Sequence, residues 1–154
     1  MKKFLKDNKG NSYIWVAFII IIFSMFTAVI YNVIYIYTTV NAARYDLERA
    51  AVVTVNENLI NENVRDLNYS IPSNMAIVSF YDNLDSLGYN NTNNIYTKIE
   101  NDKAHYSISN ITISIDGELM EIDADLTIPL IWQIESISEI KVPLHSISRV
   151  YSYD

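Results

Sequence analysis

The chain contains no cysteine, and only three glycines and three prolines occur among its 154 residues. Without cysteine there is neither a disulfide nor thiol catalysis, so a folded domain here depends on its apolar core alone. The glycines, Gly10, Gly88 and Gly117, are too scattered for a phosphate-binding loop, which argues against nucleotide binding. No G-x-S-x-G nucleophile motif is present either. We therefore expect neither an enzyme nor a cofactor.

Charged residues are absent from Gly10 to Ala43, although they make up 19% of the chain. This run exceeds the roughly 20 residues that a membrane-spanning helix needs, which excludes a soluble single-domain enzyme as the first interpretation. A cleaved secretory signal fits poorly, because its apolar stretch is only about 7–15 residues long. We predict a basic leader at residues 1–10 and a transmembrane helix at residues 11–37.

Basic residues are scarce after this apolar run. Residues 1–43 hold four lysines and one aspartate, a balance of +3, whereas the rest of the chain carries −10 of the total charge of −7. Lysine and arginine beside a spanning helix stay cytoplasmic, so we predict a single-pass cell-membrane protein with its N-terminus inside and its C-terminal domain extracellular. Nucleic acid is not expected as a partner, because the acidic part lacks a basic face.

Neither glycine nor proline interrupts the chain between Gly10 and Pro72. Past the membrane run, apolar residues recur at a spacing of four, with Ala50, Val52 and Ile60 alongside, while charged residues such as Asp46 fill the other faces. The spaced residues are Leu47, Ala51, Val55 and Leu59. The pattern predicts one continuous helix from about Ser12 to about Val64, whose exterior continuation occupies residues 38–66.

Residues 67–154 form the predicted exterior domain. Ser73 or Asn74 is positioned to cap a short helix that Gly88 ends, and Asn90–Asn94 reads as a polar loop. From Ile95 onward the apolar period changes to two, which indicates an antiparallel sheet of three or four strands. The predicted fold class is α+β, a long N-terminal transmembrane and amphipathic helix packed on a small antiparallel sheet.

The hairpin within this sheet has a predicted register. A two-residue Asp116-Gly117 turn would pair Ile113 with Met120 and Ile111 with Ile122, apolar against apolar. Because Ile108 is out of phase with Ile111, we expect a bulge near Ser109. In the last strand the apolar positions Ile140, Val142 and Leu144 predict a change of phase at Ile147, and Pro129 and Pro143 should lie at strand ends or edges.

Three polar side chains interrupt the membrane run, Ser24, Thr27 and Asn32. Each can hydrogen-bond to a neighbouring helix in the bilayer, although serine and threonine can equally bond their own backbone. We take them as candidates for helix packing.

Carboxylates repeat along the polar face of one predicted strand, at Glu121, Asp123 and Asp125, with Glu118 near the turn. Oxygen ligands can hold calcium, but the spacing is not that of a calcium loop, so we interpret them as a solvated face that discourages edge pairing. His105 and His145 have no neighbouring ligand residues at metal spacing. We predict no metal site and find no evident small-molecule substrate.

The order of leader, anchor helix, amphipathic helix and antiparallel strands resembles type IV pilins and pseudopilins. More narrowly, Asn8-Lys9-Gly10-Asn11-Ser12, the apolar run, and the stretch from Val40 to Ala51, VNAARYDLERAA, look like the TadE-like pilin family. The resemblance covers roughly residues 8 to 60 and implies a place for leader cleavage between Gly10 and Asn11. It also implies lateral packing with other pilin-like or secretion-machine subunits through the N-terminal helix.

The sequence departs from the family plan at one position. Pilin-like chains usually carry a glutamate fifth in the mature chain, where it helps to register incoming subunits. After a cut behind Gly10 that position is Trp15, and the apolar run contains no carboxylate. The resemblance therefore implies an accessory or minor pseudopilin of a bacterial Tad, type IV pilus or secretion-type assembly. The alternative hypothesis is a single-pass membrane protein that displays an exterior ligand- or partner-binding domain.

Overall fold

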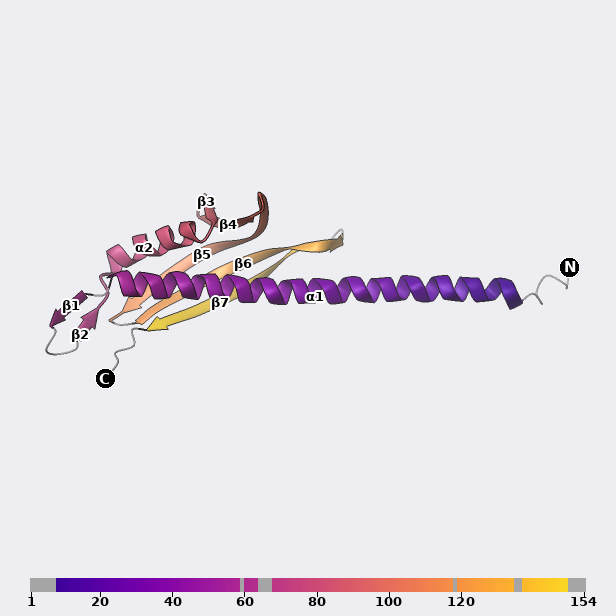
Figure 1. The fold of residues 1–154 in the computed structure, drawn as a ribbon, viewed down its shortest axis with the longest axis horizontal. Helices are drawn as coiled ribbons and strands as arrows, with labels where there is room; N and C mark the ends of the chain where they lie inside the picture. Colours follow the sequence, from indigo (N-terminus) through magenta and orange to yellow (C-terminus); the bar gives the residue numbers. More distant parts are fainter. Residues whose placement is uncertain (1–7, 59, 64–67, 118, 135–136, 150–154) are drawn as a thin grey trace.

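The computed structural model describes residues 8–58, 60–63, 68–117, 119–134 and 137–149. One long helix, α1 (Asn8–Asn58), runs beside a small domain and extends far beyond it (Figure 1). The domain begins with a two-stranded sheet, β1 (Ile60–Asn63) and β2 (Asn68–Ser70), followed by α2 (Ser73–Ser86). A five-stranded antiparallel sheet completes the chain, which confirms the predicted α+β fold. Its strands are β3 (Tyr89–Thr92), β4 (Ile95–Glu100), β5 (Lys103–Asp116), β6 (Leu119–Ile134) and β7 (Ile137–Arg149).

Helix α1 is continuous, as predicted, but its ends differ from the prediction. It begins at Asn8 instead of near Ser12, and it ends at Asn58, so the expected extension to Val64 is wrong because β1 occupies residues 60–63. Asparagine is a poor helix former. The Asn58 side-chain amide donates to the Thr54 carbonyl at 2.9 Å, a local side-chain hydrogen bond at the last residue of the helix.

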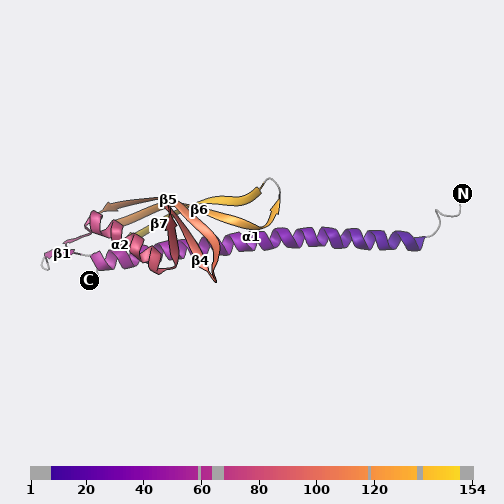
Figure 2. The same ribbon diagram turned by 90° about the horizontal axis from the view of Figure 1, so that it is seen from above.

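The second half of α1 packs on the sheet together with α2. Leu47, Ala51 and Val55 are buried as predicted, whereas Val52 is half exposed and Leu59 lies outside the described residues. The α2 residues Ala76, Phe80 and Leu84 join the same core. Figure 2 shows both helices beside the strands, with the first half of α1 extending past them.

Two details of α2 and the following segment differ from the prediction. Neither Ser73 nor Asn74 caps α2; Pro72 occupies the cap position without a side-chain hydrogen bond, and Gly88, at a φ of +87°, follows the helix as expected. The expected polar loop is instead the β3–β4 hairpin, so the sheet has one strand more than the upper prediction. Asn93 and Asn94 adopt φ of +54° and +63°, which suits a two-residue turn because asparagine tolerates this region.

The β5–β6 hairpin keeps its predicted faces but not its predicted register. Asp116 pairs with Leu119 and Ile113 pairs with Ile122, so the turn lies one residue later than expected. Gly117, at a φ of +58°, supplies the positive φ at the first turn position, which Asp116 would otherwise have to adopt. Side chains alternate with a period of two, so the apolar face is preserved.

The bulge in β5 is confirmed. The register between β5 and β6 shifts between Ser109 and Thr112, and Asn110 has a φ of +54°. Ile108 is fully buried, and Ile111 packs against the same core on the other side of the bulge. The extra residue therefore corrects the phase difference that the sequence shows.

The expected phase change in β7 is wrong. The β6–β7 pairing runs without interruption from Leu119 with Arg149 to Pro129 with Glu139. Ser146 and Ser148 therefore face the core while Ile147 is 55% exposed. The backbone ladder determines the phase here, and the two small serines leave room for α1, which packs across β6 and β7. Pro143 lies on the edge strand, and Pro129 lies beyond the part of β6 that pairs with β5, as expected for residues without an N–H.

Candidate functional site

The first half of α1 is an apolar surface that the described part of the chain leaves uncovered. Most of its large side chains from Tyr13 to Ile34 are more than half exposed, and packing on the domain begins only at Tyr35 and Ile36. By length and composition this helix can cross a membrane, and its most apolar window has a mean hydropathy of 2.5 with no residue buried. Residues 13 to 34 rise by about 33 Å, close to the thickness of a bilayer's hydrocarbon layer.

The candidate helix-packing residues lie on this exposed half. The Ser24 hydroxyl donates to the Ile20 carbonyl and the Thr27 hydroxyl donates to the Phe23 carbonyl, both at 2.9 Å. Each hydroxyl thus has a partner inside its own helix and keeps lone pairs that can accept a hydrogen bond from outside. Asn32 is partly buried, one residue beyond the exposed Tyr31. Gly10 and Asn11 lie within the first turns of α1.

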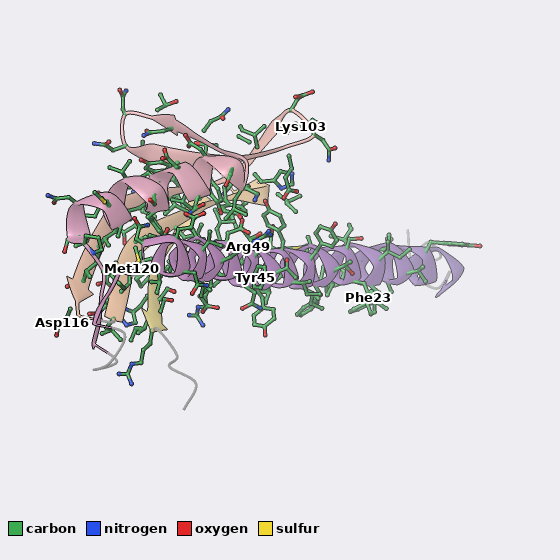
Figure 3. All side chains as sticks on the ribbon, turned by 60° about the vertical axis from the view of Figure 1, so that its left-hand side comes forward. Phe23, Tyr45, Arg49, Lys103, Asp116 and Met120 are labelled. Atoms are coloured by element: carbon green, nitrogen blue, oxygen red, sulfur yellow. The ribbon has the colours of Figure 1, made fainter. Side chains whose placement is uncertain are left out.

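Past the membrane half, exposed apolar side chains recur among polar ones such as Asn41 and Glu48 on the side of α1 away from the core. Tyr37, Tyr45 and Val52 are 69%, 64% and 49% exposed, and their spacings of eight and seven residues keep them on one face. The same face continues backwards to Ile30 and Phe23. In Figure 3 the labelled Phe23 and Tyr45 lie on the side of α1 opposite α2. We call Phe23, Ile30, Tyr37, Tyr45 and Val52 the outer stripe of α1.

A polar cluster attaches α1 to the sheet and determines which side of the helix faces outward. The Asp46 carboxylate oxygen Oδ2 accepts from Lys98 Nζ at 2.8 Å and from the hydroxyls of Tyr89 at 3.0 Å and Tyr106 at 3.3 Å. Lys98 Nζ also donates to the Leu87 carbonyl at 2.7 Å and lies 4.8 Å from the centre of the Tyr89 ring. These contacts join α1 to β3, β4 and β5.

Burial controls the chemistry of this cluster. The Asp46 and Lys98 side chains are only 16% and 13% exposed, so each charge needs the other close by. Burial raises the pKa of Tyr89 and of Tyr106 above the usual tyrosine range, and the nearby Asp46 carboxylate acts in the same direction. Both phenols therefore remain protonated hydrogen-bond donors. Since the four side chains hydrogen-bond to one another, the cluster holds α1 against the sheet.

Asp46 was predicted on a face of the helix other than the apolar stripe, and this cluster was not predicted. Asp46 adjoins the buried Leu47 and lies at the border of the apolar stripe, where a side chain can reach the sheet. Lys98, within the short strand β4, is its counter-ion. The pairing of these charges from distant segments was not visible in the spacing of either segment.

The carboxylates on the outer face of β6 are paired with polar side chains of the neighbouring strands. His145 on β7 places Nδ1 at 2.8 Å from Asp123 and Nε2 at 3.5 Å from Glu121. Asn110 donates to Asp125 at 2.8 Å. His105 lies apart, 3.8 Å from Glu100, and Glu118 falls outside the described residues. Among the side chains that the structure describes, no group of three or more histidine, aspartate or glutamate residues is arranged to hold a metal ion.

No family model matches the chain, and no curated protein or solved structure matches it either.

Proposed function

We propose that this protein is an accessory, pilin-like subunit of a bacterial envelope assembly of the Tad, type IV pilus or secretion type. Its α1 helix crosses the cell membrane and packs laterally against the anchor helices of other subunits. The observation that carries this proposal is the exposed apolar first half of α1, together with the outer-stripe residues Tyr37, Tyr45 and Val52 beyond it, because exposed apolar side chains of this kind mark a surface for packing against other proteins.

The arrangement of the fold supports the proposal. A long, exposed apolar helix that becomes one side of an α+β domain is consistent with a pilin-like fold. The TadE-like pattern from Asn8 to Ala51 points to the same class of protein. Trp15, where pilin-like chains usually carry a glutamate, favours an accessory or minor role over that of a major filament subunit.

The direction of insertion follows from the charges. The lysines Lys2, Lys3, Lys6 and Lys9 precede the apolar run, and the domain behind it is acidic. The positive-inside rule therefore places the N-terminus in the cytoplasm and the sheet outside the cell.

Single-cysteine crosslinking tests the proposal directly, because the chain has no cysteine of its own. Cysteines at Phe23, Ile30, Tyr45 and Val52 should crosslink to other anchor helices in the producing bacterium. The matched control is Ile147→Cys, which is as exposed as Val52 but lies on the outer face of β7. If the outer-stripe cysteines crosslink no better than the control, the protein is better explained as a solitary display protein.

A further inference from the structure

Three charged residues lie beside the exterior part of the outer stripe. Tyr45 and Val52, which are 64% and 49% exposed, are one heptad apart, so both can face the same partner helix. With about 100° of rotation per residue, Glu48 lies between them on this face, and Arg44 and Arg49 lie on its two flanks. All three charged side chains are exposed. This face therefore presents apolar side chains with a negative charge between them and a positive charge on either side.

The membrane determines how a second helix can approach this face. The lysine-rich N-terminus of each copy is expected in the cytoplasm, so two copies cross the membrane in the same direction. Anchor helices of the same orientation pack as a parallel pair. In a parallel coiled-coil pair, a residue on one flank faces the residue five positions later on the opposite flank of the partner helix. The sequence of α1 therefore determines which charges meet in each kind of pair.

A second copy of this chain does not fit the face. Arg44 precedes Arg49 by five residues, so in a parallel pair of identical chains each Arg44 faces the arginine at position 49 of the other chain. The two Glu48 side chains also meet, on the line between the helices. Like charges at such positions repel and exclude particular partners from coiled coils. Outside the membrane, the charges of α1 thus oppose pairing of the chain with itself.

We propose that this face binds the parallel anchor helix of a different protein, one that is acidic opposite Arg44 and Arg49 and basic opposite Glu48. Such a helix replaces every repulsive pair by an ion pair, and its own apolar side chains cover Tyr45 and Val52. The proposal rests on the lateral packing of α1 proposed above. It adds the charge pattern of the partner and excludes a second copy as the occupant.

A charge-reversed form of the same chain serves as the complementary partner in the test. It carries Arg44→Glu, Glu48→Arg and Arg49→Glu, which exchange good helix formers for one another. Parent and charge-reversed chains, each with Val52→Cys and with tags of different size, are reconstituted together into phosphatidylcholine vesicles and oxidised. We expect the mixed disulfide dimer to exceed each dimer of like chains by about tenfold at low salt, and this preference to shrink at about 1 M salt.

Lys141→Glu, on the outer face of β7, is the matched control. This substitution changes the net charge by the same −2 as the charge reversal, at an exposed position away from α1. Chains with and without Lys141→Glu should therefore pair at random. If parent chains crosslink to one another as well as they do to charge-reversed chains, the proposal is overturned and a second copy becomes the occupant.

A second cysteine position separates this proposal from lateral packing itself. Ile30→Cys reports on the membrane half of α1 in the same mixture of parent and charge-reversed chains. If position 30 crosslinks while position 52 shows no preference for the mixed dimer, lateral packing stands and the proposed charge pattern of the partner is wrong. If neither position crosslinks in this mixture, lateral packing fails together with the proposal.

Discussion

At the scale of single residues, the orientation of α1 depends on Asp46. Its carboxylate is the common acceptor for Lys98, Tyr89 and Tyr106, which come from three different strands. If the helix were rotated about its axis, this carboxylate would leave its partners and the outer stripe would turn toward the sheet. A polar contact inside the domain therefore determines which face is offered to other subunits.

Asp46→Ala should destabilise the domain by about 3 kcal/mol, because it leaves Lys98 as a largely buried charge without its counter-ion. Asp46→Leu combined with Lys98→Met should cost less than Asp46→Ala alone, since it removes both charges. Chemical unfolding of the full chain in detergent measures these differences. The control is Asp123→Ala on the exposed face of β6. Equal losses for Asp46→Ala and Asp123→Ala would show that the cluster contributes nothing.

The same cluster predicts alkaline sensitivity. Burial raises the pKa of Tyr89 and Tyr106 in the folded protein, so the folded chain keeps phenol protons that the unfolded chain loses above about pH 10. The contribution of these phenols to the free energy of unfolding is therefore constant below the pKa of an unfolded tyrosine. As the pH rises above that pKa, the free energy of unfolding declines by up to about 1.4 kcal/mol per pH unit for each phenol.

Unfolding midpoints measured from about pH 9 to about pH 11 should therefore fall. Tyr89→Phe should make the decline shallower, whereas Tyr45→Phe, at an exposed position of α1, should leave the slope unchanged. A slope that does not respond to Tyr89→Phe would assign the alkaline effect to other groups.

At the scale of elements, the strand ladder decides which side chains are buried. In β6 the alternate apolar positions from Met120 to Ile128 follow the ladder and are buried, while in β7 the ladder turns two serines inward and Ile147 outward. An isoleucine in a strand is thus no guide to burial by itself. The pairing with the neighbouring strand must be known before the isoleucine can be assigned to the buried or the exposed face of the sheet.

Ile122→Ala and Ile147→Ala test this point with the same substitution on paired strands. Ile122 is fully buried, so its truncation should cost about 2–4 kcal/mol. Ile147 is 55% exposed, and its truncation should stay within about 0.5 kcal/mol. Thermal melting of the full chain in detergent compares the two. A large loss for Ile147→Ala would restore the phase change that the sequence suggested.

At the scale of the whole molecule, the two halves of α1 have different surroundings. Its first half presents apolar side chains all round, and its second half presents an apolar face to the sheet and the outer stripe to the opposite side. The cluster around Asp46 lies on the domain side of this helix. In the proposed assembly, the domain covers one side of α1 and neighbouring subunits cover the other.

Protease accessibility tests the orientation of the whole chain. Protease added to intact protoplasts should digest the chain beyond about Ala43 and spare the N-terminal segment, because the lysine-rich end is expected to be cytoplasmic. Tags at the two termini identify the surviving fragment by immunoblotting. Protection of the C-terminal tag with loss of the N-terminal tag would reverse the proposed topology.

The sequence alone determined the features that depend on local composition and periodicity. The long apolar run predicted the exposed half of α1, the four-residue spacing predicted the buried Leu47, Ala51 and Val55, and the phase difference after Ile108 predicted the bulge. These features depend on residues close together in the chain, so a helical or strand period is enough to predict them.

Only the tertiary structure decided the features that depend on contacts between distant segments. Strand pairing determines the end of α1 at Asn58, the register of the β5–β6 hairpin and the inward-facing serines of β7. The residues that pair across strands cannot be identified from the local sequence pattern of either strand. The contact of Asp46 with Lys98 joins residues that are 52 positions apart. The physical reason for this contact is the free-energy cost of burying a charge without a counter-ion. That cost arises only once the helix and the sheet have packed together.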